Sequence, residues 1–506
     1  MKKNKALLSV YDKTNLVTIA NTLVQNNIEL LATGGTLKFL QENNIEVTDV
    51  TTVTNFPEML DGRVKTLHPN LFAGILYKRN NQKHLTTIQN HQIVTIDYVI
   101  VNLYPFFEKQ KENLNHEELI EFIDIGGPSL LRAAAKNYFD VTVVTDVDDY
   151  NQVIEEIQAI KNTTLATRKR LAAKVFNLTS AYDASIANYL NEEQFPKYYN
   201  ASFERKEVLR YGENPHQQAA VYTNLSEKEN INNWQQLQGK ELSYNNYRDI
   251  QAAINVVKEF SQPSCCAVKH NTPCGVALGI DDFDAYTKAY QSNPVSIFGG
   301  IVSFNTIVTA RTAEKLNEIF LEVIIAPEFE TAAVELFAKK KNLRILQIPK
   351  QTHIHPNIIS IDGGLLMQTK DHNNTYQLNG VTQIKPTDEQ IKQLVFAKNV
   401  VKHCTSNAIV LINNYTTAGI GSGQTSRIEA LHQAIQQVQK NKIDLAHCVL
   451  ASDAFFPFDD IVNICAEHKI KAIIQPGGSI KDQDSIDACN KNEIAMLFTG
   501  VRHFKH

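Results

Sequence analysis

A lysine and a histidine stand side by side at Lys269 and His270, directly after the apolar run Cys266–Val268. A histidine with a near-neutral pKa can act as a general base, and an adjacent lysine can stabilise a developing oxyanion. Neighbouring side chains of a regular strand point to opposite faces, so both reach one site only if the chain turns. Thr272-Pro273 predicts such a turn. The alternative is a structural histidine beside a surface lysine.

Three loops in the first 150 residues have the composition of anion sites. Thr33-Gly34-Gly35-Thr36 joins an expected strand to an expected helix, where free amides and the helix dipole favour a phosphate. In Asp61–Pro69, Arg63 and Lys65 would face the same side of an extended segment. The third loop, Asp124–Ser129, runs into an expected helix. Each loop also has a structural interpretation, as a tight turn, a solvated edge or a helix start.

Two more side chains of this region could take part in chemistry. Tyr104 follows the apolar run Tyr98–Leu103, and in an open parallel sheet the carboxyl ends of strands line the ligand crevice. It could serve as acid, base or hydrogen-bond donor, or pack in the core. Lys136 falls near the end of the helix expected after Asp124–Ser129, where a cation also complements the helix dipole.

Two further patterns argue against common cofactors. Gly419–Arg427 is rich in glycine but matches neither the dinucleotide fingerprint nor a Walker loop. His270 and Cys274 loosely resemble the zinc ligands of nucleobase deaminases. That pattern requires glutamate and cysteine where this chain has Thr272 and Ala277, so no metal site is predicted.

Composition bounds the class of protein. The chain has 506 residues, 43% hydrophobic and 21% charged, with a formal net charge of -4. These values predict a folded protein without the basic surface that duplex nucleic acid requires. We expect no membrane span and no signal peptide, and therefore a cytosolic location. The seven cysteines are an odd number without a Cys-x-x-Cys pair, which favours reduced, mostly buried thiols.

Strand and helix signals alternate along the chain, which predicts βαβ units and a mostly parallel sheet. In the first part, strands are expected at 6–10, 28–33, 98–103 and 141–145, and helices at 12–26, from after Thr36 to about 43, and at 161–190. Later strands are expected at 266–268, 323–326, 408–412, 449–452 and 472–474. The polar stretch Asn191–Ser202 places the domain boundary, giving domains 1–198 and 199–506.

Taken in order, many separated segments make the chain similar to one family. It resembles the bifunctional purine-biosynthesis enzymes that join IMP cyclohydrolase to phosphoribosylaminoimidazolecarboxamide (AICAR) formyltransferase. The segments that carry the resemblance are Ser9–Lys13, Gly34–Thr36, Gly62–Pro69, Asn102–Pro105, Asp124–Pro128, Arg210–Gln217, Ser243–Asn246, Lys269-His270, Ile324–Pro327, Ser406–Ala408, Gly419–Arg427, Ser452–Phe458 and Arg502–Phe504.

The resemblance implies an α/β fold in two parts. A methylglyoxal-synthase-like domain with a parallel sheet would carry the cyclohydrolase, and a larger domain of two cytidine-deaminase-like units, without zinc, would carry the transformylase. It also implies a homodimer with transformylase sites at the subunit interface. 10-Formyltetrahydrofolate would be a cosubstrate, and no tightly bound cofactor is expected.

The resemblance also assigns roles to residues of the second domain. His270 would be the base that deprotonates the AICAR amine, Lys269 would stabilise the oxyanion, and Asn407 would orient the formyl group. The ribotide would contact Arg210, Tyr211, Arg427 and Arg502, with Gly299, Glu322 and Ser243–Asn246 lining the same pocket. Phe455, Phe456, Gly477 and Gly478 would flank the folate.

In the first domain, the resemblance makes Lys65, Tyr104, Asp124 and Lys136 candidates for the proton transfers of ring closure. The substrate and its phosphate would contact Tyr11, Asp12, Lys13, Thr33, Gly34, Gly35, Thr36, Arg63, Thr66, Asn102 and Ile125. Ring closure is intramolecular, so holding the two reacting groups together supplies much of the acceleration.

Two departures from the family pattern leave alternatives open. Thr272 stands where the family usually has asparagine, with Asn271 one residue earlier, and Gln251 stands where relatives often have an acid. One alternative is therefore an enzyme that closes the ring but transfers formyl groups poorly. Another is a nucleotide-sensing module, since methylglyoxal-synthase-like domains also bind effectors.

Overall fold

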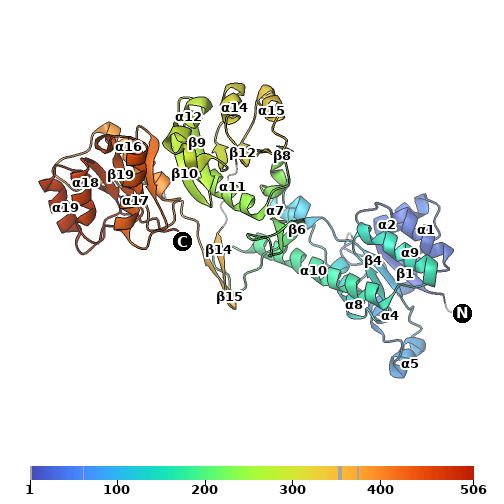
Figure 1. Cartoon of the computed structure of the whole chain (residues 1–506). Helices are drawn as coiled ribbons and strands as arrows, with labels where there is room; N and C mark the ends of the chain where they lie inside the picture. The colour runs from blue at the N-terminus through green and yellow to red at the C-terminus, as the bar shows by residue number, and fades with distance from the viewer. Residues whose placement is uncertain (1–2, 61, 351–355, 373–374) are drawn as a thin grey trace. The chain divides into compact units, whose positions relative to one another are not determined.

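The computed structural model describes residues 3–60, 62–350, 356–372 and 375–506. They form two compact units (Figure 1), which we call unit 1 and unit 2. Unit 1 comprises Met1–Glu204 and Tyr222–Lys228, and unit 2 comprises Arg205–Val221 and Glu229–His506. The chain thus passes between the units just after the predicted boundary at 198/199.

Unit 1 is built on a parallel sheet with the strand order β3-β2-β1-β4-β5. The strands are β1 (Lys5–Ser9), β2 (Glu29–Ala32), β3 (Thr48–Asp49), β4 (Tyr98–Val101) and β5 (Thr142–Val144). Every residue of β4 and β5 is buried, which is why both strands are continuous apolar or β-branched runs. The four strands predicted for this region correspond to β1, β2, β4 and β5.

Ten helices are described in unit 1, and those around the sheet bury apolar faces against it. They are α1 (Leu16–Gln25), α2 (Gly34–Glu42), α3 (Val50–Thr54), α4 (Pro69–Leu76), α5 (Gln82–Asn90), α6 (Phe106–Lys109), α7 (His116–Ile120), α8 (Gly126–Lys136), α9 (Tyr150–Ile160) and α10 (Leu165–Leu190). Two begin four residues later than predicted, α1 because Asn15 is left-handed, and α10 because left-handed Lys161 ends α9 and Thr164 caps α10.

Unit 2 contains a mixed sheet of twelve strands, in the order β16-β21-β20-β19-β17-β18-β10-β9-β11-β12-β13-β8. The strands are β8 (Gln235–Gln238), β9 (Ser264–Lys269), β10 (Thr272–Leu278), β11 (Ile301–Phe304), β12 (Val323–Ala326), β13 (Arg344–Gln347), β16 (Asn379–Gly380), β17 (Ile409–Asn413), β18 (Thr416–Gly421), β19 (Val449–Ser452), β20 (Ala472–Gln475) and β21 (Ala495–Phe498). The five strands predicted for this region all lie in this sheet.

Ten of these strands form two halves with the same topology, which we call the first half (244–347) and the second half (388–498), and β8 and β16 are the two edge strands. Each half runs helix, antiparallel hairpin, helix, and then three parallel strands separated by two helices. The helices are α11 (Tyr244–Val257), α12 (Asp282–Ser292), α14 (Ala310–Leu316) and α15 (Thr331–Phe337) in the first half, and α16 (Asp388–Val401), α17 (Arg427–Lys440), α18 (Asp460–Glu467) and α19 (Asp482–Lys491) in the second. The halves meet where β10 pairs with β18.

The repeat is visible in the sequence of the leading helices. Both α11 and α16 have fourteen residues and begin with a capping box. Ala253–Lys258 reads Ala-Ile-Asn-Val-Val-Lys, and Ala397–Lys402 reads Ala-Lys-Asn-Val-Val-Lys. The same alignment, continued without a gap, pairs the two hairpins residue by residue. The α/β fold class in two parts is therefore confirmed.

The remaining elements are short. They are α13 (Pro294–Ile297), the 3-10 helices Val147–Asp149, Ile231–Asn233 and Leu445–His447, and the hairpins β6 (Phe203–Leu209) with β7 (Ala219–Asn224) and β14 (Asn357–Ile361) with β15 (Gly364–Gln368). All seven cysteines are free in the structure, and the prediction that most of them are buried holds for six. No helix in the described parts of the chain combines the length and apolar character that crossing a bilayer requires.

Candidate active sites

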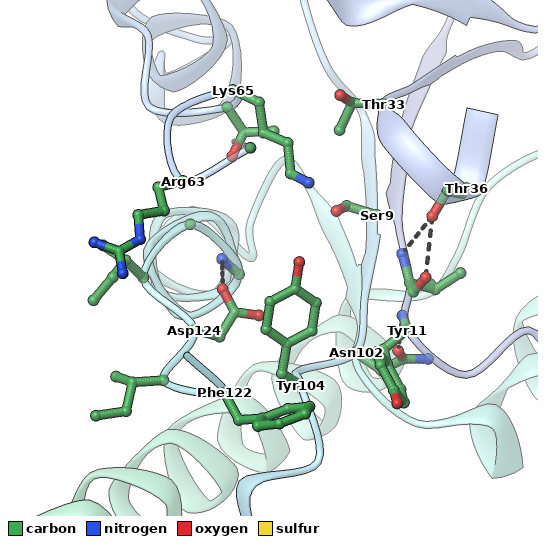
Figure 2. A pocket seen from close by; sticks show the side chains of 18 of the residues that line it. Ser9, Tyr11, Thr33, Thr36, Arg63, Lys65, Asn102, Tyr104, Phe122 and Asp124 are labelled. Atoms are coloured by element: carbon green, nitrogen blue, oxygen red, sulfur yellow. Dashed lines mark hydrogen bonds between the residues drawn. The ribbon is translucent and has the colours of Figure 1, made fainter. Parts of the chain in front are cut away.

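A cavity of about 670 Å³ opens in unit 1 at the carboxyl ends of β1, β2 and β4 (Figure 2). This is the edge at which ligands bind in open parallel sheets. The volume lies in the range of pockets for small molecules. Twelve residues predicted from the sequence line it: Tyr11, Lys13, Thr33, Gly35, Thr36, Arg63, Lys65, Thr66, Asn102, Tyr104, Asp124 and Ile125.

One end of the cavity has the features of an anion site. Helix α2 begins at Gly34 and Gly35, and Gly34 has a φ of 54°, which favours glycine. Lys65 Nζ lies 3.4 Å from the point that a Cβ on Gly34 would occupy, and Lys13 Nζ lies 3.9 Å from the equivalent point on Gly35. Two ammonium groups therefore flank a helix N-terminus, an arrangement suited to phosphate.

Directly beside this anion site lie side chains that can exchange protons. Figure 2 shows the hydroxyl of Tyr104, the carboxylate of Asp124 and the amine of Lys65 directed at the same space. Burial raises the pKa of Asp124, while the hydrogen bond from Gly127 N (2.8 Å) and the charge of Lys65 partly offset that rise. A carboxyl whose pKa is raised can act as an acid or a base closer to neutral pH.

Several predicted ligands instead hold the cavity wall together. Thr36 Oγ1 donates to Val10 O (3.1 Å) and accepts from Val10 N (3.0 Å). The amide of Asn102 accepts from Tyr11 N and Asp12 N and donates to Asp12 O. These bonds fix the loop after β1 against α2 and β4. Asp12 itself does not line the cavity.

Two predicted cations are placed differently from expectation. Arg63 lines the cavity but pairs with Glu121, a residue that the sequence did not single out. Lys136 is the last residue of α8, about 15 Å along the helix from Gly126 at the cavity. It lines a separate hollow beside Arg132 and Lys169. The structure therefore does not bring Lys136 to the cavity of its own chain. Asp61 lies outside the described residues.

In unit 2, Lys269 and His270 lie at the tip of the β9–β10 hairpin. Lys269 pairs with Thr272, so the loop is the two residues His270 and Asn271, with φ of 52° and 59°. The predicted turn at Thr272-Pro273 was wrong, because these residues begin β10. Asn271 suits a left-handed position, and its N–H donates to Asp249 Oδ1 (2.6 Å). The departure from the family pattern therefore places an asparagine where the turn favours one.

The predicted partners Gly299 and Glu322 lie just before β11, the strand beside β9, and β12, the next strand of the sheet. Lys269 Nζ donates to Phe298 O (2.9 Å) and lies 4.0 Å from the point that a Cβ on Gly299 would occupy. Glu322 donates its N–H to Gly300 O (3.0 Å) and pairs with Arg344 (2.7 Å). Lys269, Gly299 and Glu322 thus occupy one edge of the first half.

The loop that carries Arg210 and Tyr211 is fastened to the start of α11. Arg248 pairs with Glu213 (2.6 Å), and Asn245 Nδ2 donates to Glu213 O (3.3 Å). Arg210 lies over the ring of Tyr211, 4.7 Å from its centroid. The cap of α11, Ser243 with Asn246, belongs to the same region.

The second half holds the other predicted transformylase residues. Asn407 donates from its side chain and its backbone to Gln424 O, each at 3.0 Å. Arg427 pairs with the fully buried Asp453 (2.8 Å) and donates to Ser452 Oγ (2.9 Å). These bonds use Nε and Nη2 and hold the guanidinium of Arg427 in place, and neither of them uses Nη1.

The predicted folate residues divide into surface and core. Phe455 is half-buried, but Phe456 is fully buried in the core, so its predicted contact with folate was wrong. Gly477 packs against the ring of Phe498, while the Cα of Gly478 faces open space. Arg502 is exposed, with its guanidinium 4.3 Å from the centroid of the Phe504 ring.

A second cavity of about 670 Å³ lies where the halves of unit 2 meet. It is lined by Thr272–Cys274 and by Ser422, Gly423 and the amide-rich face of α17. None of the predicted transformylase residues lines it. In the described residues, no three His, Cys, Asp or Glu side chains are grouped closely enough to hold a metal ion.

Comparison with known proteins identifies the family. Residues 15–129 match the family described as MGS-like domain, and residues 134–437 match that described as AICARFT/IMPCHase bienzyme. A "Bifunctional purine biosynthesis protein PurH" from Fusobacterium nucleatum is 53% identical over 504 residues, covering 100% of both chains. The chain belongs to the AICARFT/IMPCHase bienzyme family. The predicted family is thus confirmed.

Other relatives of the bienzyme are similar along its whole length. Proteins of the same name from Clostridium beijerinckii and Clostridium botulinum strain Eklund 17B are 51% and 50% identical, each covering 100% of both chains. The crystal structure titled ForH is 32% identical over 37% of this chain and 100% of its own, with a TM-score of 0.34.

The sequence reasoning missed the residues that hold the functional side chains in place. Glu121, Asp249 and Gln424 contact Arg63, the hairpin and Asn407 respectively. Nothing in the local sequence marks Glu121 or Asp249, and Gln424 lies in the glycine-rich segment Gly419–Arg427 without a predicted role of its own. Asp453 and the fully buried Lys398 are different, because alignment of the two halves would have exposed both as charged positions where the first half has neutral ones.

Proposed function

We propose that this chain catalyses two consecutive reactions of purine biosynthesis. The first transfers a formyl group from 10-formyltetrahydrofolate to the 5-amino group of AICAR, and the second closes formyl-AICAR to IMP with loss of water. The observation that carries this proposal is the 53% sequence identity to a bifunctional relative over the full length of the chain, which includes both units.

In the transfer, the amine of AICAR is a weak nucleophile because its lone pair is delocalised. His270 takes its proton as the nitrogen attacks the formyl carbon, and Lys269 stabilises the tetrahedral oxyanion. The bond from the formyl carbon to N10 of the folate then breaks, and N10 receives a proton. Asn407 orients the formyl oxygen, and Arg427 contributes its remaining donors to the ribotide.

In ring closure, the carboxamide nitrogen attacks the formyl carbon and water leaves. Lys13, Lys65 and the N-terminus of α2 hold the phosphate, so that both reacting groups are presented to the proton-exchanging side chains beside it. Tyr104 and Asp124 move the protons. A sensing module would need only the anion site, and the presence of Tyr104 and Asp124 beside it favours the enzyme.

Three further assignments belong to this proposal. The folate is a cosubstrate and the enzyme needs no tightly bound cofactor. The functional form is a homodimer, which would complete the transformylase sites whose residues are dispersed over both halves of one chain. The cytosolic location stays a prediction.

The test is to incubate the purified chain with AICAR and 10-formyltetrahydrofolate and to identify the ribotide product by mass spectrometry. We expect IMP. Formyl-AICAR that accumulates without further conversion would contradict the cyclohydrolase assignment. Unchanged AICAR would contradict the transformylase assignment, and formyl-AICAR supplied directly would then show whether unit 1 still closes the ring.

A further inference from the structure

Lys398 is the one position at which the matching ends of α11 and α16 differ in charge. Ile254 occupies the equivalent place in Ala253–Lys258 and is 6% exposed, as expected of a core residue. Lys398 is 0% exposed. Because the same helix position packs well with an apolar side chain in the first half, the fold itself does not require a lysine there. A buried ammonium is costly, so it needs another explanation.

The side chain of Lys398 contacts the last residue of β19. Its Nζ donates to Ser452 O at 3.0 Å. The carboxylates of Asp453 and Asp371 and the guanidinium of Arg427 are close enough to influence its charge. Burial lowers the pKa of Lys398, and the two carboxylates partly offset that effect. Here too the halves differ, since Phe304 and Asn305 occupy the places of Ser452 and Asp453.

Asp453 links this lysine to two predicted site residues. Its Oδ1 accepts from Arg427 Nη2 (2.8 Å), and its Oδ2 accepts from Ser406 Oγ (2.6 Å). Ser406 directly precedes Asn407. Asn305 at the equivalent place in the first half only satisfies local backbone groups, those of Phe260, Gln262 and Ser264. The second half has thus replaced a neutral packing cluster by a buried ionic network.

We propose that Lys398 is a positioning residue for formyl transfer, whose ammonium fixes the Ser452–Asp453 segment and through it Arg427 and Asn407. This inference rests on the proposed transformylase function. The ammonium donates a hydrogen bond to the backbone carbonyl of Ser452, while the side chain of Asp453 accepts from Arg427 and Ser406. Without the cation, the carbonyl loses this hydrogen bond and the segment that carries both site contacts can shift. Displacement of about 1 Å in a catalytic geometry costs roughly a hundredfold in rate.

The first test is Lys398→Met in the full chain, with Lys392→Met as the matched control on the exposed face of the same helix. We expect the transformylase kcat of Lys398→Met to fall about a hundredfold, with ring closure of supplied formyl-AICAR unchanged. Lys392→Met should match the wild type in both steps. A Lys398→Met protein with wild-type transformylase kcat would overturn the inference, whereas an inactive wild type would overturn the transformylase proposal instead.

The second test distinguishes the charge from the volume. Lys398→Ala removes the part of the side chain that n-propylammonium would replace. We expect added n-propylammonium to raise the transformylase kcat of Lys398→Ala at least tenfold. Tetramethylammonium, which has no N–H donor, should leave this kcat unchanged at the same ionic strength. Absence of rescue by n-propylammonium, or equal rescue by both cations, would overturn the inference. This test decides the question even if Lys398→Met folds poorly.

Discussion

The two halves of unit 2 build the same hairpin and use it differently. In the first half the turn residues are His270 and Asn271, and in the second half they are Asn414 and Tyr415, all with φ between 48° and 59°. Both turns thus have the left-handed pair of residues that two-residue hairpins favour. The first turn carries a histidine and follows a lysine, whereas the second follows Asn413 and carries neither residue type. The two halves therefore share the turn and differ in its side chains.

The same comparison explains the buried network of the second half. Lys398, Ser452 and Asp453 are polar where Ile254, Phe304 and Asn305 are apolar or amide. The first half thus has a lysine and a histidine at its hairpin turn, and the second half has a buried ionic network. Fold-level similarity between the halves therefore does not imply shared function.

The largest expected effect compares the two turns directly. His270→Ala should lower transformylase kcat about a thousandfold, because it removes the base. Asn414→Ala removes the equivalent turn side chain and bears the same cost of a left-handed alanine, but should change the rate no more than about twofold. Initial rates of AICAR consumption check both. Equal losses in the two variants would show that the turn backbone, and not the imidazole, limits the reaction.

The next effect concerns the place where equivalent residues of the halves meet. Glu259 contacts His403, its counterpart in the repeat, at 2.7 Å, and Lys402 at 3.1 Å. Burial raises the pKa of Glu259, but the bonds from His403 and Lys402 outweigh it and lower the pKa to about 2, from 4.5. A lowered carboxyl pKa stabilises the fold above pH 4.5, and this stability is lost as the pH falls towards 2.

Glu259→Gln should therefore lower the free energy of unfolding by roughly 3 kcal/mol at pH 7. The difference between wild type and variant should shrink as the pH falls from 4.5 towards 2. Trp234, the only tryptophan of the chain, lies in unit 2 and reports its unfolding by fluorescence in urea. A difference that does not change over this pH range would show that the carboxylate charge does not join the halves.

The smallest effect tests how closely the hairpins pack on the helices that follow them. A Cβ on Gly421 would lie 1.8 Å from Ala430 O, whereas the equivalent Ala277 of the first half carries a Cβ. Gly421→Ala should cost about 2 kcal/mol of unfolding free energy through overpacking. Gly364→Ala is the control for the backbone cost, because Gly364 also lies in a strand without a positive φ and its added Cβ would meet no atom closer than 3.9 Å. Equal losses would mean that α17 moves freely to accommodate a methyl group.

Much of the fold follows from the sequence because its signals are local. The strands were predicted from apolar, β-branched runs that become buried parallel strands, such as Tyr98–Val101. Helix starts were less predictable, since Asn15 and Lys161 adopt left-handed conformations that no periodicity reveals. The turn was misplaced because Pro273 is also compatible with the first residues of a strand.

Site residues were predictable where they lie in loops directly after strands, because these loops gather at one edge of the sheet. Lys65, Tyr104 and Asp124 meet in one cavity as expected from their places in the chain. Lys136 does not, because a helix carries it away from that edge. Supporting partners such as Asp249 and Glu121 come from distant segments, and only the folded chain shows which polar groups pair.

Product analysis of two variants tests most directly whether one chain holds two separate sites, one for each reaction. With AICAR and 10-formyltetrahydrofolate, Lys65→Ala should accumulate formyl-AICAR and form little IMP. His270→Ala should leave AICAR unchanged but convert supplied formyl-AICAR to IMP at the wild-type rate. If either variant, folded as judged by circular dichroism, lost both steps, the assignment of one reaction to each unit would be contradicted.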